Sequence, residues 1–328
     1  MRLNTLDVKK FSPHNKKMIS RPFCPEEIIF AATSACNLRC GHCFVSKNPQ
    51  NLDIDAAKRF LASCLAAKKS LPRIQKIGFS GGEPFLRLDF IIALTQFAVK
   101  NDLLFDQIMT NGEWWQSEDD LRQSLQKVYD AGYDGKIGLS WDSFHGQSER
   151  RMRTFIQAVQ NIFGDDALCI QSVSETVRQG NQRKNPGKKN QDFPAFPDGV
   201  PVFFLPRTYP AADERAWQAK RWFKDDFCAG PGHVLFVHPD GNIAPCCGFA
   251  NENPALFIGN ITDDFEKIME NAAGNQMIKI CYEEGLAHFR RHGLRKKMRA
   301  RKKQLPGRTS DICTFCDFVC SQNLRDSD

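Results

Sequence analysis

Cys36-Asn37-Leu38-Arg39-Cys40-Gly41-His42-Cys43 places three thiols within one short stretch of the chain. The stretch directly follows an apolar, β-rich run at 28–33, so the thiols are expected in a loop at the carboxyl end of a strand. In barrels of alternating strands and helices, that end carries the chemistry. Three thiolates suit a cubane of four irons and leave one iron without a protein ligand. The alternative is a structural zinc site, with His42 or a distant thiol as the fourth ligand.

Strand and helix patterns alternate along the chain beyond this stretch. Strands are expected at 28–33, 74–80, 103–109, 136–141, 167–173 and 200–205, and amphipathic helices at 55–69, 88–100, 118–131 and 148–163. Strands that alternate with helices indicate repeated βα units around a parallel sheet. Six such units fill the chain from residue 28 to about residue 225. The connection at 178–190 is basic and rich in Gly, Asn and Pro, so a mobile loop is expected there.

The pattern changes after residue 227. Residues 234–245 predict a hairpin, with Pro239-Asp240-Gly241 as its turn. Helices are expected at about 262–273 and 275–303, before a cysteine-rich tail that begins at Cys313. The predicted division is an N-terminal extension (1–27), an α/β core (28–225) and a small Cys-rich domain (226–328).

The composition and the N-terminus indicate a chain that stays inside the cell. Hydrophobic residues make up 41% and charged residues 25% of the sequence, which is ordinary for soluble proteins, and no apolar stretch approaches the roughly 20 residues that span a bilayer. The N-terminus lacks the apolar core of a secretion signal, so a cytoplasmic location without a membrane partner is expected. In that reducing compartment, clustered cysteines among the 13 present bind metal or do chemistry more often than they form disulfides.

Basic residues gather in two runs, at 178–190 and 290–303, on a chain with a net charge of +7. Such patches attract anionic partners, including acidic peptides and nucleic acid. A solvated helix face or a mobile loop would give the same pattern. The two basic runs alone therefore do not indicate which kind of partner the protein binds.

Polar clusters follow three further strands. Phe79-Ser80-Gly81-Gly82-Glu83-Pro84 ends the second strand, Met109-Thr110-Asn111-Gly112 the third, and Ser140-Trp141-Asp142-Ser143-Phe144-His145 the fourth. Two glycines let a backbone approach a ligand closely, and a carboxylate accepts hydrogen bonds from an ammonium group. A Gly-Gly pair after a strand is usually only a turn. The clusters are specific jointly, through their order along the chain.

With these segments the chain resembles the radical S-adenosylmethionine (SAM) superfamily. The mark of that family is a CxxxCxxC loop after strand one, followed by a Gly-Gly-Glu segment after strand two. The resemblance covers about residues 28–225. It implies a partial six-stranded (β/α)6, TIM-like barrel with a catalytic 4Fe-4S cluster on Cys36, Cys40 and Cys43.

The same resemblance implies which residues bind SAM. Gly81, Gly82 and Glu83 match the segment that binds the SAM ammonium group, and Ser140 and Asp142 match positions near its carboxylate and ribose. The implied chemistry is cleavage of SAM to a 5'-deoxyadenosyl radical that abstracts hydrogen, with an electron from a donor such as a flavodoxin or ferredoxin. Weaker candidates for further contacts, for which a surface role is expected, are Arg151, Arg153 and Arg215.

A second group of cysteines lies near the C-terminus. The stretch from Cys228 to Cys246 brings two thiols to one end of the predicted hairpin, and Cys313-Thr314-Phe315-Cys316 supplies another pair. This arrangement resembles the SPASM or twitch auxiliary-cluster domains of radical SAM maturases, in a form shorter than the full SPASM pattern. The resemblance implies one auxiliary 4Fe-4S cluster on these four thiols, and a zinc ribbon of the same four is the alternative. The cysteines outside any motif, expected as small buried side chains, are Cys24, Cys64, Cys169 and Cys281.

Cys247 directly follows a predicted cluster ligand and projects differently from it. Its weak S–H bond could return a hydrogen to a carbon radical from the face opposite to abstraction, and the alternatives are a ligand or a packed thiol. Here the chain resembles radical SAM peptide epimerases, which convert L-residues to D-residues in ribosomally made peptides and use the second cysteine of such a pair as hydrogen donor. Two features depart from that family: the hairpin lacks an acidic residue near its start, and Cys320 is extra.

Three other functions compete with peptide epimerisation. A different radical SAM peptide maturase would form thioether or C–C cross-links in a precursor peptide. An RNA-modifying enzyme would use the basic runs on phosphate, but no RNA-binding module is recognisable, so a nucleic-acid partner is not expected. An iron-sulfur electron carrier or scaffold would not need Gly81, Gly82 and Glu83 behind an open iron.

Overall fold

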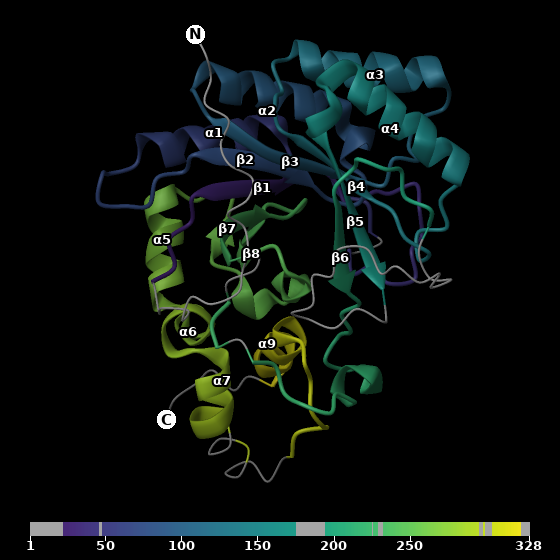
Figure 1. Ribbon diagram of the computed structural model, residues 1–328. Coiled ribbons are helices and arrows are strands. Elements are labelled where there is room, and N and C mark those ends of the chain that lie inside the picture. The colour runs from purple at the N-terminus through teal and green to yellow at the C-terminus, as the bar shows by residue number, and fades with distance from the viewer. Residues whose placement is uncertain are drawn as a thin grey trace.

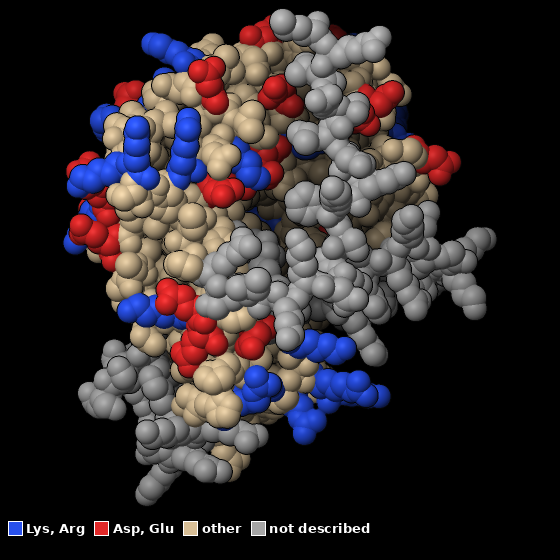
Figure 2. All heavy atoms as spheres, turned by 60° about the vertical axis from the view of Figure 1, so that its left-hand side comes forward, with Lys and Arg blue, Asp and Glu red and all other residues tan. Residues whose placement is uncertain are grey.

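The computed structural model describes residues 22–45, 48–174, 194–224, 226–228, 232–294, 298 and 304–322. The run at 178–190 that was expected as a mobile loop lies outside these residues, and so does most of the basic run at 290–303. Figure 1 shows a curved sheet at the centre, with a layer of helices above it and a smaller helical group below. Figure 2 shows both basic and acidic side chains on one face of the molecule. None of the helices described is both long and apolar enough to cross a membrane.

One nine-stranded sheet, in the order β6-β5-β4-β3-β2-β1-β7-β8-β9, forms the centre of the described chain. Its first six strands pair in parallel: β1 (Glu27–Ala31), β2 (Lys76–Ser80), β3 (Leu104–Thr110), β4 (Lys136–Ser140), β5 (Leu168–Ser174) and β6 (Val202–Pro206). Each pairs with its neighbour in sequence, as repeated βα units require. The predicted α/β fold, a partial (β/α)6 barrel, is confirmed.

Four amphipathic helices cover the outer face of these strands: α1 (Ile54–Ala66), α2 (Leu88–Lys100), α3 (Glu118–Asp130) and α4 (Glu149–Phe163). The Asp53 carboxylate caps α1 by accepting a hydrogen bond from Ala56 N at 2.7 Å. Buried aromatic rings join the two layers, since Phe90 of α2 lies 6.1 Å from Phe30 and 6.4 Å from Phe79, centroid to centroid. This core fixes the strand ends, and therefore the loops that follow them.

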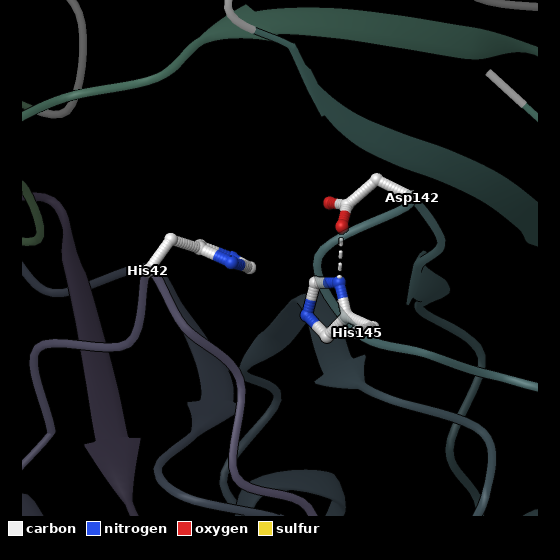
Figure 3. A group of neighbouring side chains, drawn as sticks. All are labelled: His42, Asp142 and His145. Carbon is white, nitrogen blue, oxygen red and sulfur yellow. Dashed lines mark hydrogen bonds and ion pairs between the residues drawn. The ribbon is translucent and has the colours of Figure 1, made fainter. Parts of the chain in front are cut away.

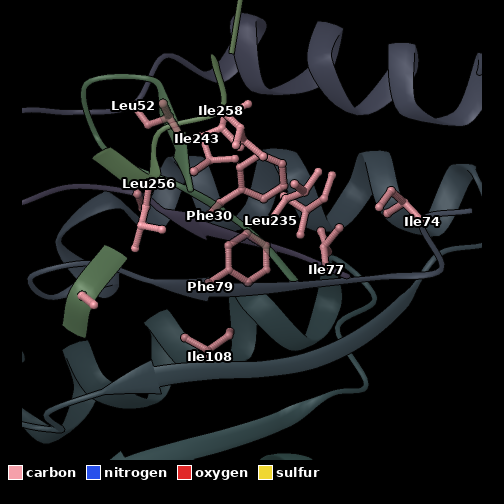
Figure 4. Close-up of a cluster of buried hydrophobic side chains, with 14 of the residues drawn as sticks. Phe30, Leu52, Ile74, Ile77, Phe79, Ile108, Leu235, Ile243, Leu256 and Ile258 are labelled. Atoms are coloured by element: carbon pink, nitrogen blue, oxygen red, sulfur yellow. The ribbon is translucent and has the colours of Figure 1, made fainter. Parts of the chain in front are cut away.

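The predicted hairpin continues the barrel sheet. It consists of β7 (Gly232–Val237) and β8 (Asn242–Cys246), and β9 (Gly259–Asn260) follows β8 at the edge. β7 pairs in parallel with β1, with Val234 opposite Glu27. Figure 4 shows Leu235 and Ile243 of the hairpin beside Phe30, in one hydrophobic cluster. The division at residue 225 stays a prediction, because one core serves both parts.

The helical pattern predicted over 275–303 is not one helix. Among the described residues it forms α6 (Gln276–Lys279), a π-turn at Ile280–Glu284, α7 (Leu286–Phe289) and a second π-turn at Arg290–Leu294. The break comes at Gly285, whose φ of +93° is a conformation that other residues rarely adopt. The remaining helices and short 3-10 turns are α5 (Phe265–Gly274), α9 (Ile312–Ser321), Pro84–Arg87, Asp165–Ala167, Glu214–Trp217, Phe249–Glu252 and Pro254–Leu256.

Candidate functional site

The thiols of Cys36, Cys40 and Cys43 lie in the loop after β1 and line a cavity of about 560 Å³. Its other walls come from the carboxyl ends of β2, β3 and β4. Of the residues predicted to bind SAM, Gly81, Gly82 and Ser140 line this cavity, whereas Glu83 and Asp142 are buried in the protein beside it. The structure therefore brings together segments that lie about 100 residues apart in the sequence.

Gly81 and Gly82 are needed for a close approach between two parts of the chain itself. Gly81 has a φ of +135°, and a Cβ there would overlap the carbonyl oxygen of Thr33. A Cβ on Gly82 would overlap the carbonyl oxygens of Ser34 and Ala35. Gly82 N donates to Thr33 O at 2.7 Å, and Glu83 N donates to Ala35 O at 2.9 Å. The end of β2 is thus fastened to the start of the cysteine loop.

The Glu83 carboxylate is fully buried and accepts three hydrogen bonds from the protein. The donors are Thr110 Oγ1 at 2.9 Å, Asn111 N at 2.8 Å and Phe85 N at 3.1 Å. Burial raises the pKa of Glu83 to about 7, against the lowering effect of these three bonds. Glu83 therefore ties β2 to β3. Its predicted contact with a SAM ammonium group stays a prediction.

Asn111 contacts the cysteine loop, a role that the sequence reasoning did not assign. Its side-chain amide donates to Asn37 Oδ1 at 2.9 Å and to Cys36 Sγ at 3.6 Å. Its own backbone is held by Glu83. The only sequence signal was a polar residue at the end of the third strand, which does not reveal a contact with a thiol 75 positions away.

Figure 3 shows His42, Asp142 and His145 gathered at the mouth of the barrel. One ligand atom from each lies within 4.8 Å of the others, as in a metal-binding group. The Asp142 carboxylate is nevertheless satisfied by protein: His145 Nδ1 lies 2.7 Å from Oδ1, and Phe144 N and Val173 N donate at 2.9 and 3.1 Å. These contacts account for its burial without a cation.

The Asp142–His145 pair carries opposite charges. Burial works to lower the pKa of His145, but its hydrogen bonds with Asp142 and Cys40 raise that pKa to about 9. Burial works to raise the pKa of Asp142, and the hydrogen bond with His145 outweighs it and holds that pKa below its ordinary value. The pair places a cationic ring beside a thiol of the CxxxCxxC loop. The predicted contact between Asp142 and ribose stays a prediction.

A second cavity, of about 500 Å³, occupies the inside of the barrel. Ser80, His42 and Met109 line both cavities, so the two adjoin. Much of the second cavity is apolar, with walls that include Ile29, Val173, Leu205 and Phe236. Arg207, which the sequence reasoning missed, also lines it, with its guanidinium 4.6 Å from the centroid of the Phe144 ring.

Cys246 and Cys247 face different cavities, as successive residues at the end of a strand should. Cys247 lines the barrel cavity, and Cys246 lines an apolar pocket below the sheet. Cys313 lines both, so the pocket adjoins the barrel cavity. Burial raises the pKa of the Cys247 thiol to about 12, so it keeps its proton at neutral pH. The sequence-based expectation that the two thiols project differently agrees with this arrangement.

The pocket that Cys246 lines also brings together the other three predicted auxiliary ligands. Cys228, Cys313 and Cys316 line it, and Cys281 is a fifth thiol there. Burial raises the pKa of Cys228 to about 11, so metal binding would release protons. Several thiols that converge in a buried, apolar pocket suit a thiolate-ligated cluster. No motif marked Cys281, which lies more than 30 residues from every other member in sequence.

The weaker SAM candidates are held by acidic neighbours. Arg151 donates to Glu113 and lies 3.5 Å above the Trp115 ring, and Arg153 pairs with Glu149 at 2.7 Å. The third, Arg215, pairs with Asp213 at 2.7 Å. None of the three lines either cavity in the described part of the chain. The acidic partners of these three arginines agree with the surface role that was expected for them.

The remaining cysteines differ in burial. Cys64 lies in the core, as expected, and Cys320 is buried one helical turn after Cys316. Cys169 is half-buried. Cys24 is exposed, contrary to the expectation of a buried thiol, because it lies before β1 on the surface.

Two family matches cover the two cysteine groups. Residues 28–152 match a family described as a 4Fe-4S single cluster domain, and residues 228–317 match SPASM, described as an iron-sulfur cluster-binding domain. The first range contains the CxxxCxxC loop with its Gly-Gly-Glu partner, and the second contains all four predicted auxiliary ligands. The chain is a radical SAM enzyme with a SPASM domain. Its cofactors are SAM, a catalytic 4Fe-4S cluster and an auxiliary 4Fe-4S cluster.

Known proteins resemble this radical SAM enzyme at low identity. The putative peptide biosynthesis protein YydG of Bacillus subtilis (strain 168) is 22% identical over 301 residues, which cover 86% of this chain and 88% of that protein. The GTP 3',8-cyclase of Chlorobaculum tepidum is 26% identical over 208 residues, covering 58% and 56%. The solved structure of anSMEcpe with bound AdoMet and a Cp18Cys peptide aligns with a TM-score of 0.54 at 14% identity, covering 92% of this chain and 98% of that one. That likeness shows a shared fold.

A Gly82→Ala substitution is expected to empty the catalytic site of this radical SAM enzyme. The added methyl group would push on two backbone carbonyl groups, which cannot yield without moving the start of the cysteine loop. After anaerobic reconstitution, iron analysis should fall from about eight toward about four irons per chain. Gly274→Ala is the matched control, because a Cβ there meets no atom within 4 Å. Full iron content in the Gly82 variant would show that the loop tolerates the shift.

Proposed function

We propose that this radical SAM enzyme modifies a ribosomally made precursor peptide and inverts L-residues to D-residues, with Cys247 as the hydrogen donor. The peptide substrate is supported by the similarity to YydG, described as a putative peptide biosynthesis protein, over most of both chains. The anSMEcpe structure, which shares the fold, holds a peptide together with AdoMet. A flavodoxin or ferredoxin would supply the electron.

The observation that carries inversion is the position of Cys247 relative to the radical site. Val234 lies opposite Glu27, at the start of β1, and Cys246 lies opposite Gly232. The cysteine pair is therefore near the amino ends of the barrel strands, whereas the CxxxCxxC loop follows the carboxyl end of β1. A peptide carbon in the barrel cavity would have the SAM site on one side and the Cys247 thiol on the other.

The cofactors supply the radical, and the protein supplies position and shielding. When bound, the catalytic cluster and SAM would supply the radical that abstracts a hydrogen from the peptide. Cys36, Cys40 and Cys43 would hold that cluster, and Asn111 orients the first of them through its amide. The apolar walls of the barrel cavity exclude water from a peptide radical. Cys247 would then transfer the hydrogen atom of its S–H bond to the opposite face of that carbon. A thiyl radical would remain on Cys247, and a second electron from the flavodoxin or ferredoxin with a proton from solvent would restore the thiol.

Labelling with deuterium tests this proposal. A peptide encoded by a short gene beside this one would be incubated with enzyme, SAM and reductant in deuterated water, where the Cys247 S–H exchanges to S–D. Each inverted residue should then carry one deuterium at its α-carbon, located by mass spectrometry and confirmed by chiral analysis after hydrolysis. A cross-linking maturase would instead remove hydrogens and leave the stereochemistry of intact residues unchanged, which would refute inversion.

A further inference from the structure

Cys281 belongs to the auxiliary pocket although it stands outside every cysteine motif. Its Sγ lies 3.8 Å from Cys316 Sγ, and both side chains are buried. Its carbonyl oxygen accepts a hydrogen bond from Cys228 N at 3.0 Å, so its backbone is also fastened to a predicted ligand. It lies in the π-turn Ile280–Glu284, and π-turns inside helices occur frequently at functional sites.

Five thiols converge where a cubane offers four corners. The sulfurs of two ligands bound to different irons diverge, because each thiolate extends outward from its own corner. The Sγ atoms of Cys281 and Cys316 are instead within hydrogen-bond distance of each other. Cys316 belongs to the Cys-x-x-Cys pair of the SPASM match, whereas no pattern includes Cys281. Cys316 is therefore the ligand of the two, and Cys281 is its neighbour.

We propose that Cys281 donates its S–H to the sulfur of Cys316 and thereby raises the reduction potential of the auxiliary cluster. The proposal rests on the predicted ligand set of that cluster. A thiolate bound to iron has no proton, so in this pair only Cys281 can be the donor. Hydrogen bonds to cluster sulfurs stabilise the added negative charge of the reduced state, and they are one of the means by which a protein sets the potential.

Cys281 is then a positioning residue in the pocket, and it contacts no substrate. The four irons of the cluster would keep their predicted ligands, which are Cys228, Cys246, Cys313 and Cys316. Cys281 covers the sulfur of one of them in a pocket otherwise lined by apolar side chains such as Leu256 and Ile278. Of the other polar hydrogens nearby, the Tyr282 hydroxyl donates to Pro245 O at 3.0 Å, whereas the Cys320 thiol also donates to Cys316. Cys281 and Cys320 therefore share the electrostatic effect on that sulfur.

The test compares Cys281→Ala and Cys281→Ser in the full-length, anaerobically reconstituted enzyme. Iron analysis should give about eight irons per chain in both variants, as in wild type. In a redox titration followed by electron paramagnetic resonance, Cys281→Ala should lower the ratio of reduced to oxidised auxiliary cluster at fixed potential by about threefold to tenfold. Cys281→Ser should retain the wild-type ratio or exceed it, since a hydroxyl group also donates.

Cys169→Ala, which removes a thiol from β5 on the far side of the barrel, is the control and should leave the ratio unchanged. Loss of about four irons in both Cys281 variants would make Cys281 a ligand and overturn the proposal. An unshifted potential in Cys281→Ala would also overturn it. Neither readout uses a peptide, so this inference can fail while the proposed epimerisation stands, and the reverse also holds.

Discussion

Cys247→Ala enzyme is expected to cleave SAM at close to the wild-type rate and to form no inverted peptide. The substitution leaves the CxxxCxxC loop and its cavity untouched, because Cys247 lines only the barrel cavity at the opposite end of the strands. Without the S–H donor, a peptide radical has no hydrogen source on its second face. The measurements are 5'-deoxyadenosine by chromatography and D-residues by chiral analysis.

The control for this variant is Cys64→Ala, which removes a buried thiol of α1 that lines neither cavity. It should retain both activities at nearly wild-type levels. If Cys247→Ala still inverts the peptide, Cys247 has no place in the mechanism. If it loses SAM cleavage as well, the substitution has disturbed the barrel and must be repeated as Cys247→Ser.

Replacement of Cys36, Cys40 and Cys43 together by Ala should abolish SAM cleavage altogether. These are the thiols predicted to bind the catalytic cluster, and no other cysteine lines their cavity among the described residues. Iron content should fall from about eight to about four per chain, while the auxiliary cluster and its spectrum persist. The outcome distinguishes the open-iron assignment from a structural metal.

A complementary variant, Cys313→Ala with Cys316→Ala, separates the two clusters. It should lose the other four irons, roughly, and retain the signals of the CxxxCxxC site. Bound zinc in place of those irons in the wild-type protein would identify the C-terminal pocket as a zinc ribbon. Cleavage of SAM that survives the triple replacement would contradict the assignment of the catalytic site.

Local patterns in the sequence predicted the barrel well. Alternation of apolar runs and amphipathic segments located all six parallel strands and α1–α4, since burial on one or both faces leaves a periodic record in the residues themselves. The Asp240-Gly241 turn was also predicted correctly. Its residue types suit the turn, because Gly241 has a φ of +86° and Asp240 accepts a hydrogen bond from Asn242 N. The motifs at the strand ends could also be found, because each is a short continuous stretch of the sequence.

Contacts between distant parts of the chain could not be predicted from these local patterns. Periodicity gives no sign that β7 pairs with β1, which lies about 200 residues earlier, or that Cys281 joins the auxiliary pocket. The role of Gly81 and Gly82 in binding SAM stays a prediction, and their sequence did not show that they also admit the backbone of residues 33–35. The break at Gly285 was missed because a single glycine within a helical pattern is often tolerated.

The pairing of β7 with β1 has a consequence for how a substrate is handled. Backbone hydrogen bonds along this seam make the strand before the CxxxCxxC loop and the strand before the Cys246–Cys247 turn parts of one rigid frame. The spacing between the two ends of the barrel is therefore set by paired strands and not by the C-terminal helices. Under the proposed function, a peptide would have to place its target residue between these two ends.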